Sequence, residues 1–146
     1  NPSVKGVLKV DLNEKLPFKT NSFDFILTTE VIEYISNHKI FFSECQRILK
    51  PGGSLILSTP MFANLHNDLI RYTNQGLKMH MNQFHSIRIE PIGNLFTISL
   101  DLFRRKSKLF GNFYYAIQII LIYFLGKKLI NINSSYPSGY IVLGIV

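Results

Sequence analysis

The sequence has little of what stabilises small secreted folds or holds structural metal ions. It contains one cysteine, Cys45, among 146 residues, which excludes an internal disulfide and any zinc site built on several thiolates. His80 and His85 are five residues apart, off one helical face, and no carboxylate cluster accompanies any of the four histidines, so we expect no metal site. Disorder is excluded for most of the length, because 47% of the residues are hydrophobic.

Acidic residues are scarce in the second part of the chain. Residues 1–60 carry seven Lys and Arg against six Asp and Glu, whereas residues 61–146 carry nine against three. The excess positive charge that gives the chain its net charge of +7 therefore lies mostly in residues 61–146. This distribution does not favour a diffuse nucleic-acid-binding surface. The length fits one domain and leaves little room for a second.

An initiator methionine and a signal sequence are both missing from the start, which reads Asn1-Pro2-Ser3. An apolar run begins directly afterwards, at Val4. We therefore expect a fragment whose first residue lies inside a domain.

The first 60 residues predict a parallel α/β unit, because strand, helix and strand follow one another at the required spacing. Asn37 can cap a helix over 38–50, which Pro51-Gly52-Gly53 would end. The expected strands are 7–11, 23–29 and 54–59, and the second is apolar enough for burial on both faces.

Beyond Pro60 the pattern is weaker. Thr73 can cap a helix from Asn74 to about Asn82. Two further strands are expected at 85–91 and 139–146, and some 45 mostly helical, very apolar residues lie between them.

Polar residues stand where the expected parallel strands end, and ligands of open parallel sheets bind at these ends. The first end carries Asp11-Leu12 and the second Thr28-Thr29-Glu30; the third runs into a loop that contains His66, Asp68, Arg71 and Tyr72. An acid at a strand end can accept a hydrogen bond from an amine or a hydroxyl. Asp11 is at least as well explained as a turn residue or a helix cap.

Six motifs occur in a familiar order: Asp11, Leu16-Pro17-Phe18, Ser22-Phe23-Asp24, Glu33-Tyr34, the run from Arg47 to Gly53, and HNDLIRYTNQGL from His66. With GYIVLGIV at 139–146 as a last strand, they resemble the class I S-adenosylmethionine-dependent methyltransferases, in particular the methyltransferase type 11 group. The resemblance implies a Rossmann-like α/β methyltransferase sheet. Tyr34 stands where the family often has histidine, so no role is carried over to it.

The family's glycine-rich loop and the acid that holds the cofactor ribose precede its third strand, and this sequence contains neither. The resemblance thus implies an N-terminally truncated domain that binds the cofactor poorly by itself. By the resemblance, the strand ending at Asp11 is the family's third strand and 23–29 is its fourth. In the family the two missing strands lie between these two in the sheet. The strand ending at Asp11 should therefore pair directly with 23–29 or stay unpaired.

The resemblance also implies roles for individual residues. Asp11 would accept a hydrogen bond from the adenine amine, with Leu12 beside the ring, and Thr28, Thr29 and Glu30 would line the methionine and sulfonium side of S-adenosylmethionine. Substrate would approach Asp68, Arg71 and Tyr72. His66 is the candidate base by its intrinsic pKa, and a loop histidine that bridges backbone is an equal alternative. Arg71 can bind a substrate anion or pair with Asp68 three residues back.

The stretch Leu109–Gly126 is apolar, and six cations but no acid occur from 102 to 146. Its length is borderline for a membrane span, whereas its flanking cations and aromatics suit a helix lying at a membrane interface. The alternative is an internal helical cap. We favour a cap that also touches an anionic membrane, in a cytoplasmic protein that is peripheral at that membrane.

The sequence thus predicts one partial methyltransferase domain over 1–146. It comprises three strands in 1–60, a substrate-side loop, helix and strand in 61–93, a basic apolar cap in 94–138 and the last strand in 139–146. The expected activity is methyl transfer from S-adenosylmethionine to a small molecule, lipid-linked or sugar-like. A non-catalytic methyltransferase-like partner or membrane-associated module is the alternative, and nucleic acid is not expected as substrate.

Overall fold

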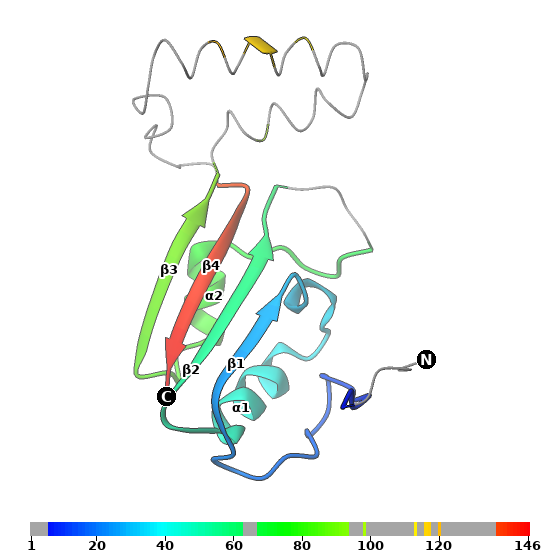
Figure 1. Cartoon of the computed structure of the whole chain (residues 1–146), viewed down its shortest axis with the longest axis vertical. Helices are drawn as coiled ribbons and strands as arrows, with labels where there is room; N and C mark the ends of the chain where they lie inside the picture. The colour runs from blue at the N-terminus through cyan, green and yellow to red at the C-terminus, as the bar shows by residue number, and fades with distance from the viewer. Residues whose placement is uncertain are drawn as a thin grey trace.

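The computed structural model describes residues 6–62, 67–93 and 137–146, together with positions 98, 113, 116, 117 and 120. Its elements form two layers, one β-sheet and one layer of helices (Figure 1). In chain order they are β1 (Phe23–Thr29), the 3-10 helix η1 (Ile32–Tyr34), α1 (His38–Ile48), β2 (Leu49–Pro60), α2 (Asn74–His80), β3 (Ser86–Ile92) and β4 (Gly139–Ile145).

The strands form one sheet in the order β1-β2-β4-β3. β1 and β2 are parallel, and β4 runs antiparallel to both of its neighbours, β2 and β3. Parallel β1 and β2 are joined through α1, as the sequence predicts. The strands expected at 23–29, 85–91 and 139–146 are confirmed to within one or two residues.

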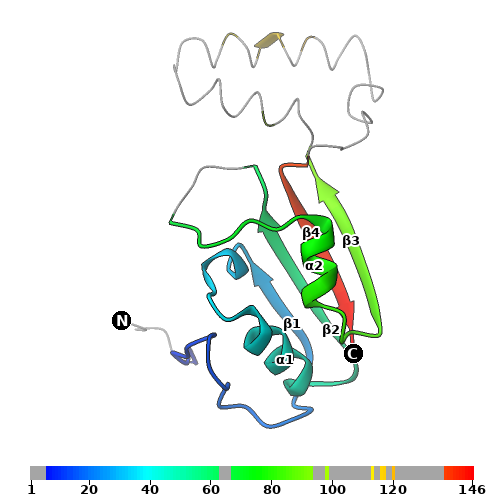
Figure 2. The same ribbon diagram turned by 180° about the vertical axis from the view of Figure 1, so that it is seen from behind.

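Both α-helices pack on the same face of the sheet (Figure 2). Leu55 and Leu57 of β2 and Val142 of β4 point to this face and are fully buried. Gly144 allows α2 and its C-terminal turn to approach β4, since a Cβ atom at this position would lie 2.6 Å from Met81 Cε. The core therefore lies between one side of the sheet and the two helices.

The other face of the sheet carries apolar side chains that no described element covers. Phe25 is 65% exposed and Leu27 61% exposed on β1, and Ile56 and Ile141 continue this surface across β2 and β4. The prediction that 23–29 is buried on both faces is wrong for the described chain. The apolar run meets helices on one side only, and a run of this kind cannot reveal from sequence alone which faces are covered.

Both predicted N-caps are confirmed. Asn37 Oδ1 accepts a hydrogen bond from the amide of Ile40 at 3.2 Å, and Thr73 Oγ1 accepts one from the amide of Gly76 at 3.1 Å. In each case a side chain satisfies an amide that has no partner within its own helix.

The end of α1 differs from the prediction. The helix stops at Ile48 because Leu49 is extended, with φ −72° and ψ 142°. Consequently, Pro51-Gly52-Gly53 lies inside β2 and does not itself terminate the helix. Gly52 has a φ of 80°, a left-handed conformation that favours glycine, and its amide donates to the carbonyl of Val146 at 2.7 Å.

The strand expected at 7–11 is not formed. Val7 and Leu8 are more than half exposed, and β1 lies at the edge of the sheet without a described strand on its outer side. A strand persists only where its backbone groups pair with a neighbour. Of the two outcomes that the sequence left open for this segment, the unpaired one is observed.

Most of the expected cap at 94–138 lies outside the described residues. Positions 113, 116, 117 and 120 are helical, and Phe113, Ile117 and Ile120 are exposed. Within the part of the chain that the structure describes, no helix combines the length and the hydropathy that crossing a membrane requires.

Candidate functional site at the carboxyl ends of the parallel strands

The segment that precedes β1 is held against α1 by a glutamate and an arginine. Glu44 Oε2 accepts a hydrogen bond from the amide of Leu16 at 2.8 Å, while Arg47 donates to the carbonyls of Leu16 at 3.0 Å and Phe18 at 2.8 Å. Arg47 also pairs with Glu44 at 2.6 Å. Hydrogen bonding from Arg47 is the main reason that the pKa of Glu44 lies below its usual value.

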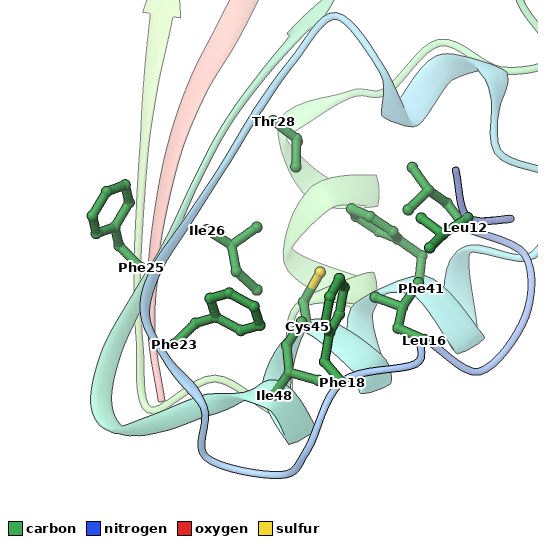
Figure 3. Close-up of a pocket in the computed structure, with 11 residues that line it drawn as sticks. Leu12, Leu16, Phe18, Phe23, Phe25, Ile26, Thr28, Phe41, Cys45 and Ile48 are labelled. Atoms are coloured by element: carbon green, nitrogen blue, oxygen red, sulfur yellow. The ribbon is translucent and has the colours of Figure 1, made fainter. Parts of the chain in front are cut away.

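This anchored segment closes an apolar pocket of about 280 Å³ between β1 and α1 (Figure 3). Leu12 and Thr28, both expected at the cofactor site, are among its lining residues. Cys45 faces the same pocket, and burial raises the pKa of its thiol to about 12, which makes it unreactive. The pocket thus joins two of the expected cofactor residues through an apolar surface.

Asp11 lies on the exposed side of this segment and forms a local turn. Its Oδ1 accepts hydrogen bonds from the backbone amide of Asn13 at 2.8 Å and from the side-chain amide of Asn13 at 2.9 Å. Asn13 Oδ1 in turn accepts from the amides of Ser36 and Asn37 before α1. The hydrogen bonds from Asn13 lower the pKa of Asp11, and Asp11 therefore has the turn role that the sequence left open.

The end of β1 places its three candidate residues in different surroundings. Thr28 Oγ1 is buried without a hydrogen-bond partner among the described residues, whereas Thr29 is exposed. Glu30 has a left-handed φ of 53°, and its Oε1 accepts a hydrogen bond from Ser58 Oγ on β2 at 2.9 Å. A non-glycine residue in this conformation is uncommon and costs free energy, and such residues cluster at functional sites.

The loop after β2 is docked on η1. The carbonyl of Glu33 accepts hydrogen bonds from the amides of Leu69 at 2.8 Å and Ile70 at 3.3 Å. Asp68 forms an ion pair with Arg71 and a hydrogen bond with the hydroxyl of Tyr34. The pairing of Arg71 with Asp68 is the second of the two options that the sequence left open. His66 lies outside the described residues.

Tyr72 belongs to the hydrophobic core. It is 2% exposed, and its ring makes edge contacts with the rings of His38 and His80, at centroid distances of 5.2 Å and 5.7 Å. Its hydroxyl is buried without a partner among the described residues. Burial, with a smaller contribution from the charge of Glu33, raises the pKa of this hydroxyl.

Sequence reasoning assigned no role to Glu33, which the structure places at the centre of this region. The residue is 1% exposed, and its Oε2 is buried without a hydrogen-bond partner within the described chain. Burial is the main cause that raises its pKa. The only sequence signal was its place in the Glu33-Tyr34 motif, since a glutamate in a short turn is usually solvated.

Comparison with known proteins agrees with this architecture. Residues 3–57 match the family model described as a methyltransferase domain. This first part of the chain is thus similar to S-adenosylmethionine-dependent methyltransferases. The match includes β1, α1 and most of β2, and thus the carboxyl end of β1 with its candidate cofactor residues.

Among the curated proteins, the chain is 40% identical over 48 residues to the mitochondrial ubiquinone biosynthesis O-methyltransferase of Rattus norvegicus, covering 33% of the chain and 14% of the relative. It is 41% identical over 46 residues to a probable S-adenosylmethionine-dependent methyltransferase of Mycolicibacterium smegmatis, covering 32% and 18%. The similarity therefore covers less than a quarter of each relative.

Solved structures share the fold of this chain. A complex of the Haloferax volcanii Trm112 methyltransferase activator with a putative methyltransferase gives a TM-score of 0.61 at 17% identity, covering 94% of this chain and 60% of the other. Phosphoethanolamine N-methyltransferase 2 of Haemonchus contortus, in complex with S-adenosyl-L-methionine, gives 0.57 at 18% identity, covering 92% and 35%.

Proposed function

We propose that this chain forms the acceptor-facing side of a site that transfers a methyl group from S-adenosylmethionine to a small molecule. The observation that carries the proposal is the polar cluster at the carboxyl ends of β1 and β2. There the charges of Glu30, Asp68 and Arg71 act on the carboxyl of Glu33, and Asp68 pairs with Arg71. This edge is where open parallel sheets bind their ligands.

The residues that are present suit the adenine side of the cofactor. The two hydrogen bonds from Asn13 to Asp11 both go to Oδ1, which leaves Oδ2 available to accept from an exocyclic amine. Leu12 supplies apolar surface in the pocket beside it. Thr28 Oγ1 has no described partner, and we propose that Thr28, Thr29 and Glu30 at the strand end contact the methionine part.

The bound cofactor supplies a methyl group activated by a sulfonium, so the chain has to align an acceptor and handle its proton. Asp68, Arg71 and Tyr72 are the proposed acceptor-side residues, within a substrate-side segment at 61–93. His66 stays a prediction from the sequence as the base. An Asp68–Arg71 pair can reorient a guanidinium toward an anionic acceptor group.

We further propose that the acceptor is lipid-linked and that the cap at 94–138 brings the protein to an anionic membrane surface. The name of the rat relative, an O-methyltransferase of ubiquinone biosynthesis, supports a hydroxyl on a lipid-like molecule. The exposed positions Phe113, Ile117 and Ile120 have helical spacing on one face. Cations flank them in the sequence, as in helices that lie at membrane interfaces.

Titration calorimetry with S-adenosylmethionine tests the cofactor assignment. We expect Asp11→Ala to weaken binding roughly tenfold, the effect of losing a charge-assisted hydrogen bond. The matched control is Asp24→Ala, which removes an exposed acid at the opposite end of β1, where it pairs with Lys50. If the two replacements weaken binding equally, the assignment of Asp11 is wrong. Cofactor binding without transfer to any acceptor would favour the non-catalytic partner.

A further inference from the structure

Two polar atoms without a described partner lie in the same buried region, beneath the loop that follows β2. They are Glu33 Oε2 and the hydroxyl of Tyr72, in residues that are 1% and 2% exposed. The amides of Leu69 and Ile70 donate to the carbonyl of Glu33, which brings the segment just before Tyr72 against η1. Buried polar atoms are rarely left unpaired in folded proteins, so such a pair requires an explanation.

The backbone around this region is firmly fixed. The carbonyl of Glu33 holds the amides of Leu69 and Ile70, and the ring of Tyr72 packs against His38. The two unpartnered atoms belong to side chains, whereas the backbone carbonyl of Glu33 is hydrogen bonded. This arrangement is typical of a preorganised binding site, in which a rigid scaffold presents polar atoms to a ligand.

We propose that Glu33 Oε2 accepts the proton of the methyl acceptor, an O–H or N–H group, and that the Tyr72 hydroxyl orients the same acceptor atom. The inference rests on the proposed methyl transfer and adds to it the residue that takes the proton. As the proton moves to Oε2, the lone pair left on the acceptor atom forms the new bond to the methyl carbon. The bond between this carbon and sulfur breaks, and its electrons remain on sulfur, which becomes a neutral thioether.

The electrostatic surroundings of Glu33 suit this role. Glu30 and Asp68 disfavour its charged form, while Arg71 favours it; Tyr34 contacts Asp68, and His38 and His80 face Tyr72 from α1 and α2. A carboxyl with a raised pKa is a stronger base than an ordinary glutamate, and enzymes prepare general bases by burial of this kind. Oε2 is itself buried, so bulk water does not solvate it.

Glu44 provides a matched control within the same chain. It is also a buried glutamate, but both of its carboxylate oxygens accept hydrogen bonds, from Arg47 and from the amide of Leu16. The experiment follows the side-chain carboxyl carbons of both residues by carbon-13 NMR in the whole chain during a pH titration. The titration is repeated with catechol as a hydroxyl probe and with 2-phenylethylamine as an amine probe.

We expect the Glu33 signal to titrate above the ordinary range for glutamate and to shift when one of the probes is added, whereas the Glu44 signal titrates below that range and does not respond. A response to catechol identifies a hydroxyl acceptor, and a response to 2-phenylethylamine identifies an amine. An ordinary Glu33 titration, or a raised one that neither probe perturbs, would overturn the proposal.

Turnover with labelled S-adenosylmethionine separates this inference from the proposed function. Glu33→Gln should lower kcat about a hundredfold and remove the acid limb of its pH profile, Glu33→Asp should restore part of the rate, and folded Glu44→Gln should keep the wild-type profile. A probe that shifts the Glu33 signal but is never methylated would contradict the methyl transfer and leave the binding site standing. Transfer that depends on His66 but is unchanged in Glu33→Gln would refute the role of Glu33.

Discussion

The two buried glutamates of this chain occupy contrasting regions. Glu44, on α1, has hydrogen bonds to both carboxylate oxygens and joins the helix to a segment 28 residues earlier. Glu33, on η1, has a carboxylate oxygen without a described partner and three charged neighbours at the carboxyl ends of the parallel strands. The pKa of Glu44 is lowered and that of Glu33 is raised.

This contrast separates a carboxylate that maintains the fold from one that is available for chemistry. A fully paired buried charge gains little from any further partner, because its desolvation is already offset. An incompletely paired one costs free energy in the folded chain, and that cost is reduced when a ligand supplies the missing hydrogen bond. Burial alone therefore does not distinguish the two roles, whereas the count of hydrogen bonds does.

Removing the fold-maintaining carboxylate should have the largest effect on stability. We expect Glu44→Ala to lower the free energy of unfolding by about 2 kcal/mol, since hydrogen bonds that involve a charged group are lost. Urea denaturation followed by circular dichroism measures this change, with Glu33→Gln as the comparison that should show no such loss. Equal losses in both variants would erase the distinction between the two glutamates.

The pH dependence of stability should differ in sign between the two residues. Glu33 has a folded pKa above its ordinary 4.5, so its stabilising contribution is complete at lower pH and is lost as the pH rises through the folded pKa. Glu44 has a folded pKa below 4.5, so its contribution is present at higher pH and is lost as the pH falls through the folded pKa.

Denaturation of the wild type, Glu33→Gln and Glu44→Gln over a series of pH values measures both slopes. The Glu33→Gln chain should lack the decline above pH 4.5, and the Glu44→Gln chain should lack the decline on the acid side. Slopes of the same sign for both residues would contradict the directions given for their pKa values.

An exposed ion pair should give the smallest effect. Asp24 and Lys50 are 2.7 Å apart, but their side chains are 79% and 45% exposed. We expect Asp24→Asn to change the free energy of unfolding by less than about 1 kcal/mol, because solvent screens such pairs. A loss of stability as large as that of Glu44→Ala would mean that an ion pair stabilises the fold equally whether it is buried or exposed.

Local signals in the sequence predicted most of the fold. Alternating apolar residues predicted β3 and β4, and Asn37 and Thr73 marked the starts of α1 and α2 because a cap acts within three residues of its own position. The prediction of a strand at 7–11 was wrong because this strand depends on a non-local partner. Its formation depends on a neighbouring strand, and no property of Val7 or Leu8 reveals whether one is present.

The candidate site was predicted in part. The pattern of the sequence placed Thr28 and Glu30 at the end of a parallel strand, and the structure has them there, since strand ends follow from local pattern; their role in binding stays a prediction. Glu33 was missed because its burial depends on Leu69 and Ile70, whose amides reach it from a distant loop. Sequence spacing alone could not separate the two options for Arg71, and the structure adds the ion pair with Asp68.

The position of β4 in the sheet has a consequence for how the protein is made. β4 is the last strand along the sequence, yet it lies between β2 and β3 and pairs with both. During synthesis, β2 and β3 leave the ribosome without their shared neighbour. Their facing edges stay unpaired while the 46 residues between β3 and β4 are made. Such long-range pairing is slow to form. The nascent chain therefore presents two unpaired strand edges until Gly139–Ile145 has emerged, and this interval is when it most needs a chaperone.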